Sequence, residues 1–316
     1  MADKLWIGGD GGGTGSWAIA ANWSPSGVPV AADVVYIDIN NQNTIYPINA
    51  GLDQSLIDLD GVHIAQAFTG LIGLTTAYLQ IRTDRLTIGN SSGRTNEAGS
   101  KRINIELQNT TDCVAHIYDT ATTAEDTGRD PLIIKTANSG TANHNFSIAG
   151  GIVGLGSLAA DDEFKSQWVT ITPEGPSSPQ VTIGAGATAT NLYIGRGEVH
   201  NQGAAMTLVE MLSGEYTAWK GGAHTTMNVY GGMAHYYSNG TITTLRVSSG
   251  GVWETTRDAR AKTVTTTQLL DGGSINARTA EPASVTWTNS IDLVECGLED
   301  VSLDIGDHVR IQQASI

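Results

Sequence analysis

The chain of 316 residues is short of several kinds of residue, and each shortage excludes a class of protein. No apolar run is long enough to span a membrane, and no apolar stretch of the signal-peptide kind follows Met1. We therefore expect no membrane partner and a product that begins in a cytoplasm. Long stretches with helical periodicity are also missing, the most helix-like segment being 157–168. This absence predicts an all-β protein.

Positive charge is scarce as well. Lys and Arg together number 17 against 32 Asp and Glu, which gives a formal net charge of −15. Proteins that bind DNA or RNA need clustered Lys and Arg to contact phosphates, and no basic stripe occurs here. We therefore expect no nucleic-acid partner and a soluble, self-repelling molecule.

What the sequence does contain is a short phrase that recurs five times between Leu192 and Arg278. Counted from the last glycine of each phrase, the intervals are 17, 18, 19 and 22 residues. A slightly elastic period with glycine at a fixed corner is typical of the coils of a β-solenoid. The phrases are Ile194–His200, Met211–Thr217, Val229–His235, Val247–Glu254 and Leu270–Asn276.

The residues around each corner glycine alternate in polarity, as in a strand with one buried face. The glycine itself is expected to supply a positive φ. Three residues before it lie Ile194, Met211, Val229 and Leu270. Two residues after it come side chains that we predict to point inward, namely Val199, Tyr216, Ala234, Trp253 and Ile275. One residue further on are side chains that we predict to point outward, namely His200, Thr217, His235, Glu254 and Asn276.

Short β-branched strands continue through the middle of the chain and share an apolar-polar-Ile-Gly phrase, as in Leu86–Gly89 and Val181–Gly184. We therefore predict one single-stranded parallel β-helix, a β-solenoid, with right-handed coiling as the general case. The Pro- and Ser-rich segment 173–179 suggests a division. The predicted parts are an N-terminal cap or attachment segment (1–40), an irregular solenoid with long loops (41–180) and a regular β-helix with a C-terminal cap (181–316).

Three tryptophans, Trp6, Trp17 and Trp23, occur within the first 23 residues. Because large aromatic side chains are costly to leave in water, we expect them to cap the open end of the stack or to form an attachment surface. An uncapped end would present bare strand edges.

The two cysteines, Cys113 and Cys296, are expected to be free thiols. In one solenoid about nine coils would separate them, or about 40 Å at the usual strand spacing. A disulfide needs Cα atoms within about 7 Å.

Several motifs that suggest a cofactor or metal fail on closer inspection. The glycine tract 8–15 has no helix or lysine after it, which excludes a phosphate-binding loop. Asp58–Gly61 lacks the strict repeat of calcium-binding β-rolls. The seven histidines have no metal-ligand spacing. We expect no metal and no cofactor.

Two glutamates could serve catalysis. Glu198 and Glu215 hold the same corner position on adjacent coils, with Glu254 and Asp258 two coils away from Glu215. Like charges stacked in this way would raise the pKa of one carboxyl by repulsion, which an acid catalyst needs. Solvated corner glutamates are far commoner, so we predict no catalytic residue and keep this pair as the alternative.

Trp219, Tyr236 and Tyr237 form an aromatic group near the middle of the repeat. It could stack on a glycan, form a subunit interface or pack in the core. We expect interface or core packing.

The opening Trp17-(x)4-Asn22-Trp23-Ser24-Pro25-Ser26-Gly27-Val28-Pro29-(x)3-Asp33-Val34-Val35-Tyr36-Ile37 resembles the start of many β-solenoid segments. These segments occur in bacterial surface proteins of autotransporter type and in structural proteins of tailed bacteriophages. The resemblance covers about thirty residues and marks architecture only.

Surface proteins of that type carry an export signal and a C-terminal anchor or barrel, and neither is visible here, which favours the phage side. The resemblance then implies a non-enzymatic virion protein, folded in the host cytoplasm, that decorates or cements the capsid or forms a head fibre. Its expected partners are the major capsid protein or a neck or tail protein, and further copies in a homotrimer. The alternatives are a tailspike-like glycan-binding or glycan-degrading protein, with a groove lined by Glu198, Glu215, Trp219 and Tyr237, and a secreted bacterial β-helix adhesin.

Overall fold

The computed structural model of the chain describes residues 2–8, 15–38, 46–65, 68, 70–74, 76–89, 105–109, 112–120, 130–136, 144–156, 164–175, 177–278, 285–305 and 310–313. Within these residues it contains 28 strands and two short 3-10 turns, η1 (Ala20–Asn22) and η2 (Leu298–Asp300), which confirms an all-β chain. Neither of these turns has the length or the apolar composition needed to cross a membrane.

The chain divides into two compact units, one of Met1–Gln167 with Gly175–Val181 and one of Trp168–Glu174 with Thr182–Ile316. Strands β13 (Phe164–Ile171) and β14 (Gln180–Ile183) contribute residues to both units. The predicted helix-like segment 157–168 is a strand from Phe164 onward, and 157–163 lies outside the described residues. Most of the glycine tract 8–15 also lies outside them.

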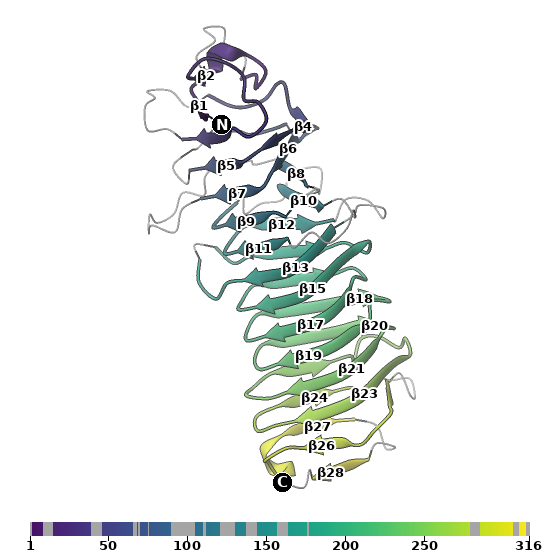
Figure 1. Cartoon of the computed structure of the whole chain (residues 1–316). Helices are drawn as coiled ribbons and strands as arrows, with labels where there is room; N and C mark the ends of the chain where they lie inside the picture. Colours follow the sequence, from purple (N-terminus) through teal and green to yellow (C-terminus); the bar gives the residue numbers. More distant parts are fainter. Residues whose placement is uncertain are drawn as a thin grey trace. The chain divides into compact units, whose positions relative to one another are not determined.

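In the first unit, consecutive strands along the chain mostly alternate between two sheets (Figure 1). The pairing within each sheet is parallel, except that β1 and β2 are antiparallel. One sheet has the order β2 (Trp23–Ser24), β1 (Asp3–Trp6), β3 (Val34–Ile37), β5 (Gly61–Ile64), β7 (Arg85–Ile88), β9 (Val114–Ile117) and β11 (Asn145–Ile148). The other has the order β4 (Asp53–Leu59), β6 (Leu79–Thr83), β8 (Ile105–Asn109), β10 (Leu132–Thr136) and β12 (Ile152–Leu155).

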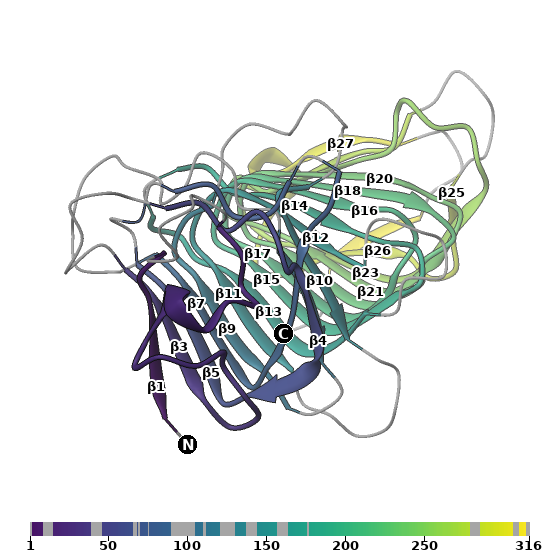
Figure 2. The same ribbon diagram turned by 90° about the horizontal axis from the view of Figure 1, so that it is seen from above.

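The second unit repeats the alternation with longer strands, which form two layers in Figure 2. One sheet has the order β15 (Ala187–Ile194), β17 (Ala205–Met211), β19 (His224–Val229), β21 (Thr241–Val247), β23 (Lys262–Leu269), β26 (Ile291–Leu293) and β28 (Ile311–Gln313), and β25 (Val285–Trp287) also pairs with β23. The other has the order β16 (Glu198–Asn201), β18 (Glu215–Lys220), β20 (Met233–Ser238), β22 (Val252–Glu254), β24 (Ser274–Asn276) and β27 (Ser302–Asp304). These parallel ladders are consistent with a β-solenoid.

The inward row predicted from the repeat is confirmed. Its members are direct register partners on neighbouring strands, and each side chain is at most 1% exposed. They form one continuous stack of buried side chains: Val199, Tyr216, Ala234, Trp253 and Ile275.

The outward row is also in register. His200, His235 and Asn276 are partly buried. Thr217 and Glu254 are buried, although the alternation along their strands places both on the outer face.

The corner glycines follow the prediction in three of the five phrases. Gly197, Gly214 and Gly232 have positive φ, but in the last two phrases the positive φ belongs to Gly250 and Gly272, one residue earlier than predicted. The turn there is one residue longer. For the same reason Leu269, and not the predicted Leu270, is the register partner of Val247.

In the sheet that contains β17 and β21, one corner of each coil falls within a strand. Buried residues normally alternate along a strand, but Met206 and Val209 on β17, and Ile242 and Leu245 on β21, are three residues apart. The strand turns at this point, so one strand covers two sides of the interior.

The three N-terminal tryptophans form an aromatic cluster in the first unit. Trp23 packs edge-on against Trp6 and Trp17, with ring centroids 5.1 and 4.7 Å apart, and its Nε1 donates to the Trp17 carbonyl at 2.8 Å. All three are buried. The indoles are therefore interior side chains and not an exposed attachment surface.

Both cysteines are free, as predicted, and both are buried. Burial raises the pKa of the Cys113 thiol to about 12, so that this thiol is protonated at neutral pH.

Candidate functional site on the outer face of β18, β20 and β22

Polar and aromatic side chains gather on the outer face of three neighbouring strands. The parallel register places Thr217 on β18 beside His235 on β20, and His235 beside Glu254 on β22. Trp219 lies beside Tyr237 two residues further along. Since residues two apart on a strand share a face, the repeat itself brings these side chains together.

His235 lies between two carboxylates. Its Nε2 is 3.1 Å from Glu215 Oε1, and its Nδ1 contacts Glu254 Oε1. Tyr237 donates its hydroxyl to the same Glu254 oxygen at 2.5 Å. The second oxygen, Glu254 Oε2, accepts from the Thr256 hydroxyl at 2.6 Å and from the Thr256 backbone N–H at 3.1 Å. Both oxygens of this buried carboxylate are thus satisfied.

These contacts determine the protonation states of Glu254 and Tyr237. Burial opposes ionisation of Glu254, but hydrogen bonds from Thr256, Tyr237 and His235 outweigh it and lower its pKa to about 2. Burial, together with the hydrogen bond to Glu254, raises the pKa of Tyr237. At neutral pH Glu254 is therefore a carboxylate and Tyr237 a neutral phenol that donates to it.

An imidazole held by a carboxylate at one nitrogen is the arrangement of a general base. Here the other nitrogen of His235 faces Glu215 and does not open directly to a substrate. Glu215, His235 and Glu254 thus contact one another in a row that joins three successive coils. These contacts connect neighbouring coils, and they leave neither nitrogen of His235 directed at a substrate as in an acid-base pair.

The predicted pair Glu198 and Glu215 is brought side by side, since the two are register partners on β16 and β18. Each side chain is about half exposed, and each faces a histidine. Glu198 Oε2 is 3.7 Å from His200 Nε2, and Glu215 contacts His235. Asp258 points elsewhere, to Arg260 and Lys262.

The predicted aromatic group is divided between the two faces of the sheet. Trp219 and Tyr237 lie on the outer face with ring centroids 5.0 Å apart, and Trp219 is 42% exposed. Tyr236 points inward, is fully buried, and packs against His224 and Trp253. Adjacent residues of a strand point to opposite faces, so these two tyrosines cannot share a surface.

Sequence reasoning missed a polar network in the interior. His224 Nδ1 donates to the Gly222 carbonyl at 3.1 Å, so its Nε2 accepts from the Tyr216 hydroxyl at 2.7 Å. Asn201 donates to the same hydroxyl at 2.9 Å. Burial lowers the pKa of His224 to about 4 and keeps it neutral. No local pattern indicates this network, because its members lie on three different coils.

It also missed a buried ion pair. Lys262 is almost fully buried, and its Nζ lies 3.1 Å from Asp258 Oδ2 and 2.6 Å from Thr255 Oγ1. The spacing of Asp258 and Lys262, four residues apart, was the available signal.

In the part of the chain that the structure describes, no group of three or more His, Cys, Asp or Glu side chains is placed to hold a metal ion. Comparison of the chain with protein family models, with curated proteins and with solved structures finds no match.

Proposed function

We propose that the chain is a non-enzymatic structural protein of a phage virion, of the capsid-decoration or head-fibre type. In this proposal it is a single parallel β-helix whose N-terminal end is capped by the cluster of Trp6, Trp17 and Trp23. The observation that carries the proposal is the continuous inward row, in which equivalent residues of successive coils are buried register partners.

A ladder of this kind makes a stiff scaffold. Each coil forms backbone hydrogen bonds with the next, so unpaired strand edges remain only at the ends. The repeated corners present their side chains at regular intervals. Such a body suits attachment to, or display from, a regular shell of subunits.

Attachment is proposed at a corner of the second unit. Leu212, Tyr230 and Met233 are 45%, 37% and 41% exposed, and Leu212 and Tyr230 follow the ends of neighbouring strands β17 and β19. Exposed apolar side chains grouped in this way are typical of interaction surfaces. Further copies in a homotrimer, and the major capsid protein or a neck or tail protein, are the proposed partners.

The outer face supports the non-enzymatic part of the proposal. Glu215 contacts His235, and both oxygens of Glu254 are hydrogen-bonded within the cluster. A carboxylate that acts as acid or nucleophile has to face its substrate instead.

Two measurements test the proposal. Cryo-electron microscopy of the purified particle is expected to show density for this chain, and its absence would exclude the virion role. Light scattering of the isolated protein is expected to give three times the 33.1 kDa of one chain. The Tyr230→Ser variant is expected to weaken this association, with Trp219→Ala as the control.

One observation favours a second function, glycan binding or cleavage on the outer face. The exposed indole of Trp219 lies against Tyr237, and Glu215 is on the same face of β18. Incubation with bacterial capsular polysaccharide, followed by an assay for new reducing ends, tests it. Activity that is lost in Glu215→Gln and kept in Glu198→Ala would establish this function, whereas the structural proposal expects no activity.

A further inference from the structure

A pocket of about 520 Å³ opens in the second unit, away from the outer-face cluster. It is lined by residues of β23, β25, β26 and β28, by the segment between β25 and β26, and by Arg310, which directly precedes β28. Its volume lies within the roughly 300–1,000 Å³ of ordinary ligand sites. The lining is unusual for such a site, because it consists of one aromatic ring and otherwise polar side chains.

Beside the pocket, the chain that pairs with β23 through β25 and β26 carries one residue more than β23 does. Val264 pairs with Trp287 and Thr267 with Ile291. Two residues therefore separate the paired positions on β23, but three separate them on the other side. The extra residue falls at the corner of the coil, where a bulge turns side chains out of the ladder.

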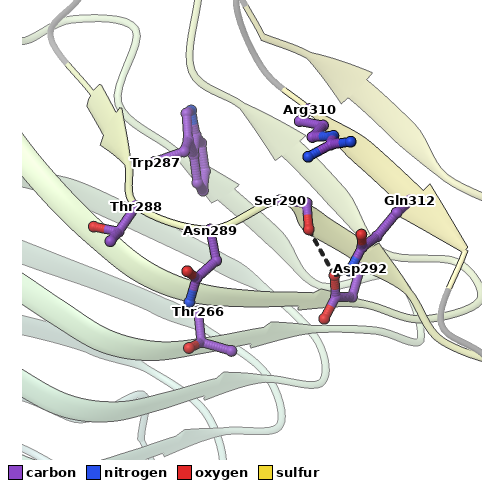
Figure 3. A pocket seen from close by; sticks show the side chains of 8 residues that line it. All are labelled: Thr266, Trp287, Thr288, Asn289, Ser290, Asp292, Arg310 and Gln312. Carbon is purple, nitrogen blue, oxygen red and sulfur yellow. Dashed lines mark hydrogen bonds between the residues drawn. The ribbon is translucent and has the colours of Figure 1, made fainter.

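The aromatic wall is fixed in place. Trp287 packs edge-on against the buried Trp253, with ring centroids 5.9 Å apart and planes 65° apart. Trp287 itself is only partly buried. Figure 3 shows its indole opposite the side chain of Arg310, with Asn289 and Ser290 below them.

Both hydrogen bonds to the Asp292 carboxylate reach the same oxygen, Oδ1. Its Oδ1 accepts hydrogen bonds from the Ser290 hydroxyl at 3.2 Å and from Gln312 Nε2 at 2.8 Å (Figure 3). Among the described residues, no protein donor reaches its Oδ2. A positioned carboxylate oxygen is thus left to accept from a ligand.

The charges of the lining point to an uncharged ligand. Asp292 and Arg310 carry opposite formal charges, and the other lining residues are neutral. The whole chain carries −15, which disfavours an anionic ligand in general.

We propose that this pocket binds an uncharged saccharide. A pyranose ring has one apolar face, which the indole of Trp287 covers, and hydroxyls around its rim. Asp292 and Asn289 accept from these hydroxyls, and Asn289 and Arg310 donate to them. The proposal does not depend on the virion role, since a structural protein of any origin could carry such a site.

An oligosaccharide array tests the proposal with the full chain. The probes are oligomers of glucose, galactose, mannose and N-acetylglucosamine, with glucuronate and galacturonate oligomers as their charged counterparts. The wild type is expected to bind neutral oligomers in preference to the charged ones. The neutral oligomer that binds best is then titrated by calorimetry against the variants.

Trp287→Ala is expected to abolish binding, and Trp287→Phe to retain it more weakly. Asp292→Asn keeps the shape of the side chain but removes the charge, so we expect an affinity about tenfold lower, as for a hydrogen bond that loses its charged acceptor. Trp219→Ala is the matched control, because its indole belongs to the outer-face cluster, and its affinity should equal that of the wild type. Circular dichroism establishes that each variant is folded.

Three results would overturn the proposal: no neutral oligomer binds, uronate oligomers bind better, or the folded Trp287 and Asp292 variants bind as well as the wild type. Binding that is lost in Trp219→Ala and kept in Trp287→Ala would assign the saccharide to the outer face instead. That outcome would also support the second function considered above.

Discussion

Two charged residues of the second unit, Glu254 and Lys262, are buried without being left unpaired. Each is surrounded by groups that complement its charge: Glu254 accepts from Tyr237 and Thr256, and Lys262 donates to Asp258. A charge is costly to remove from water unless such partners replace it. Both residues are therefore sites where single substitutions have large effects.

Removing one partner of the Lys262 pair is expected to be strongly destabilising. Asp258→Ala leaves the buried ammonium without its carboxylate, which for such pairs costs about 3–5 kcal/mol. Chemical denaturation measures the free energy of unfolding. The double variant Asp258→Ala/Lys262→Met should recover a substantial part of the loss, and a double variant as unstable as the single one would contradict the role of the pair.

The stability of the outer-face cluster depends on pH through Glu254. Its pKa is about 2 in the folded chain against an ordinary glutamate value of 4.5, so its contribution is fully present above pH 4.5 and is lost as the pH falls toward 2. The free energy of unfolding should therefore fall more steeply over this range in the wild type than in Glu254→Gln. Parallel curves for the two proteins would show that Glu254 is not the group responsible.

Among the secondary-structure elements, the corners between strands use glycine for two different reasons. At Gly214 the φ is 84° and an added Cβ would lie 2.4 Å from the Gly197 carbonyl oxygen. At Gly250 the φ is 87°, but nothing lies within 4 Å of an added Cβ. The first corner needs both the conformation and the space, and the second needs the conformation alone.

These two corners make a matched experiment. Gly250→Ala is expected to cost about 1–2 kcal/mol, the price of a left-handed conformation for a residue with a Cβ. Gly214→Ala adds a clash with the neighbouring coil and should cost clearly more. Denaturation of the two variants under the same conditions provides the comparison, and equal losses would mean that the coils separate easily at Gly214.

At the scale of the whole molecule, each unit consists of mostly parallel ladders in which the inner strands have a neighbour on both sides. In the second unit β27 and β28 end the two sheets among the described residues, whereas β17, β19 and β21 lie inside one of them. Local opening is cheapest where fewest contacts are lost.

Amide hydrogen exchange should therefore be slowest in β17, β19 and β21 and fastest in β27 and β28. Mass spectrometry of peptides from the exchanged protein measures this order. Uniform exchange along the second unit would mean that its coils open together and not from the end of the ladder.

Much of the fold could be predicted because the solenoid repeats a local pattern. Glycine and period-2 alternation are readable within seven residues, and they placed Val199, Tyr216 and Trp253 correctly in the interior. The same reasoning failed at Leu270, where a turn one residue longer places Leu269, and not Leu270, in register with Val247. The extra residue of this turn is recognised only from the pairing of β23 with the neighbouring strand β21.

The candidate sites were less predictable than the fold. The pair Glu198 and Glu215 was found by its position in the repeat, but the contact of Glu215 with Glu254 through His235 was not. Tyr236 and Tyr237 are adjacent in the sequence and lie on opposite faces. Side-chain contacts between coils depend on rotamers and on exposure, which the repeat does not specify.

By itself the sequence determined the period of the coils, the residues that fill their interior and the free state of both cysteines, because these follow from local polarity and spacing. Only the tertiary structure decided that Glu254 is a buried anion, that Lys262 is paired, and that a pocket opens beside Trp287. The physical reason is that charge, burial and cavities arise where segments from different coils meet, and a shift of one residue in their register changes all three.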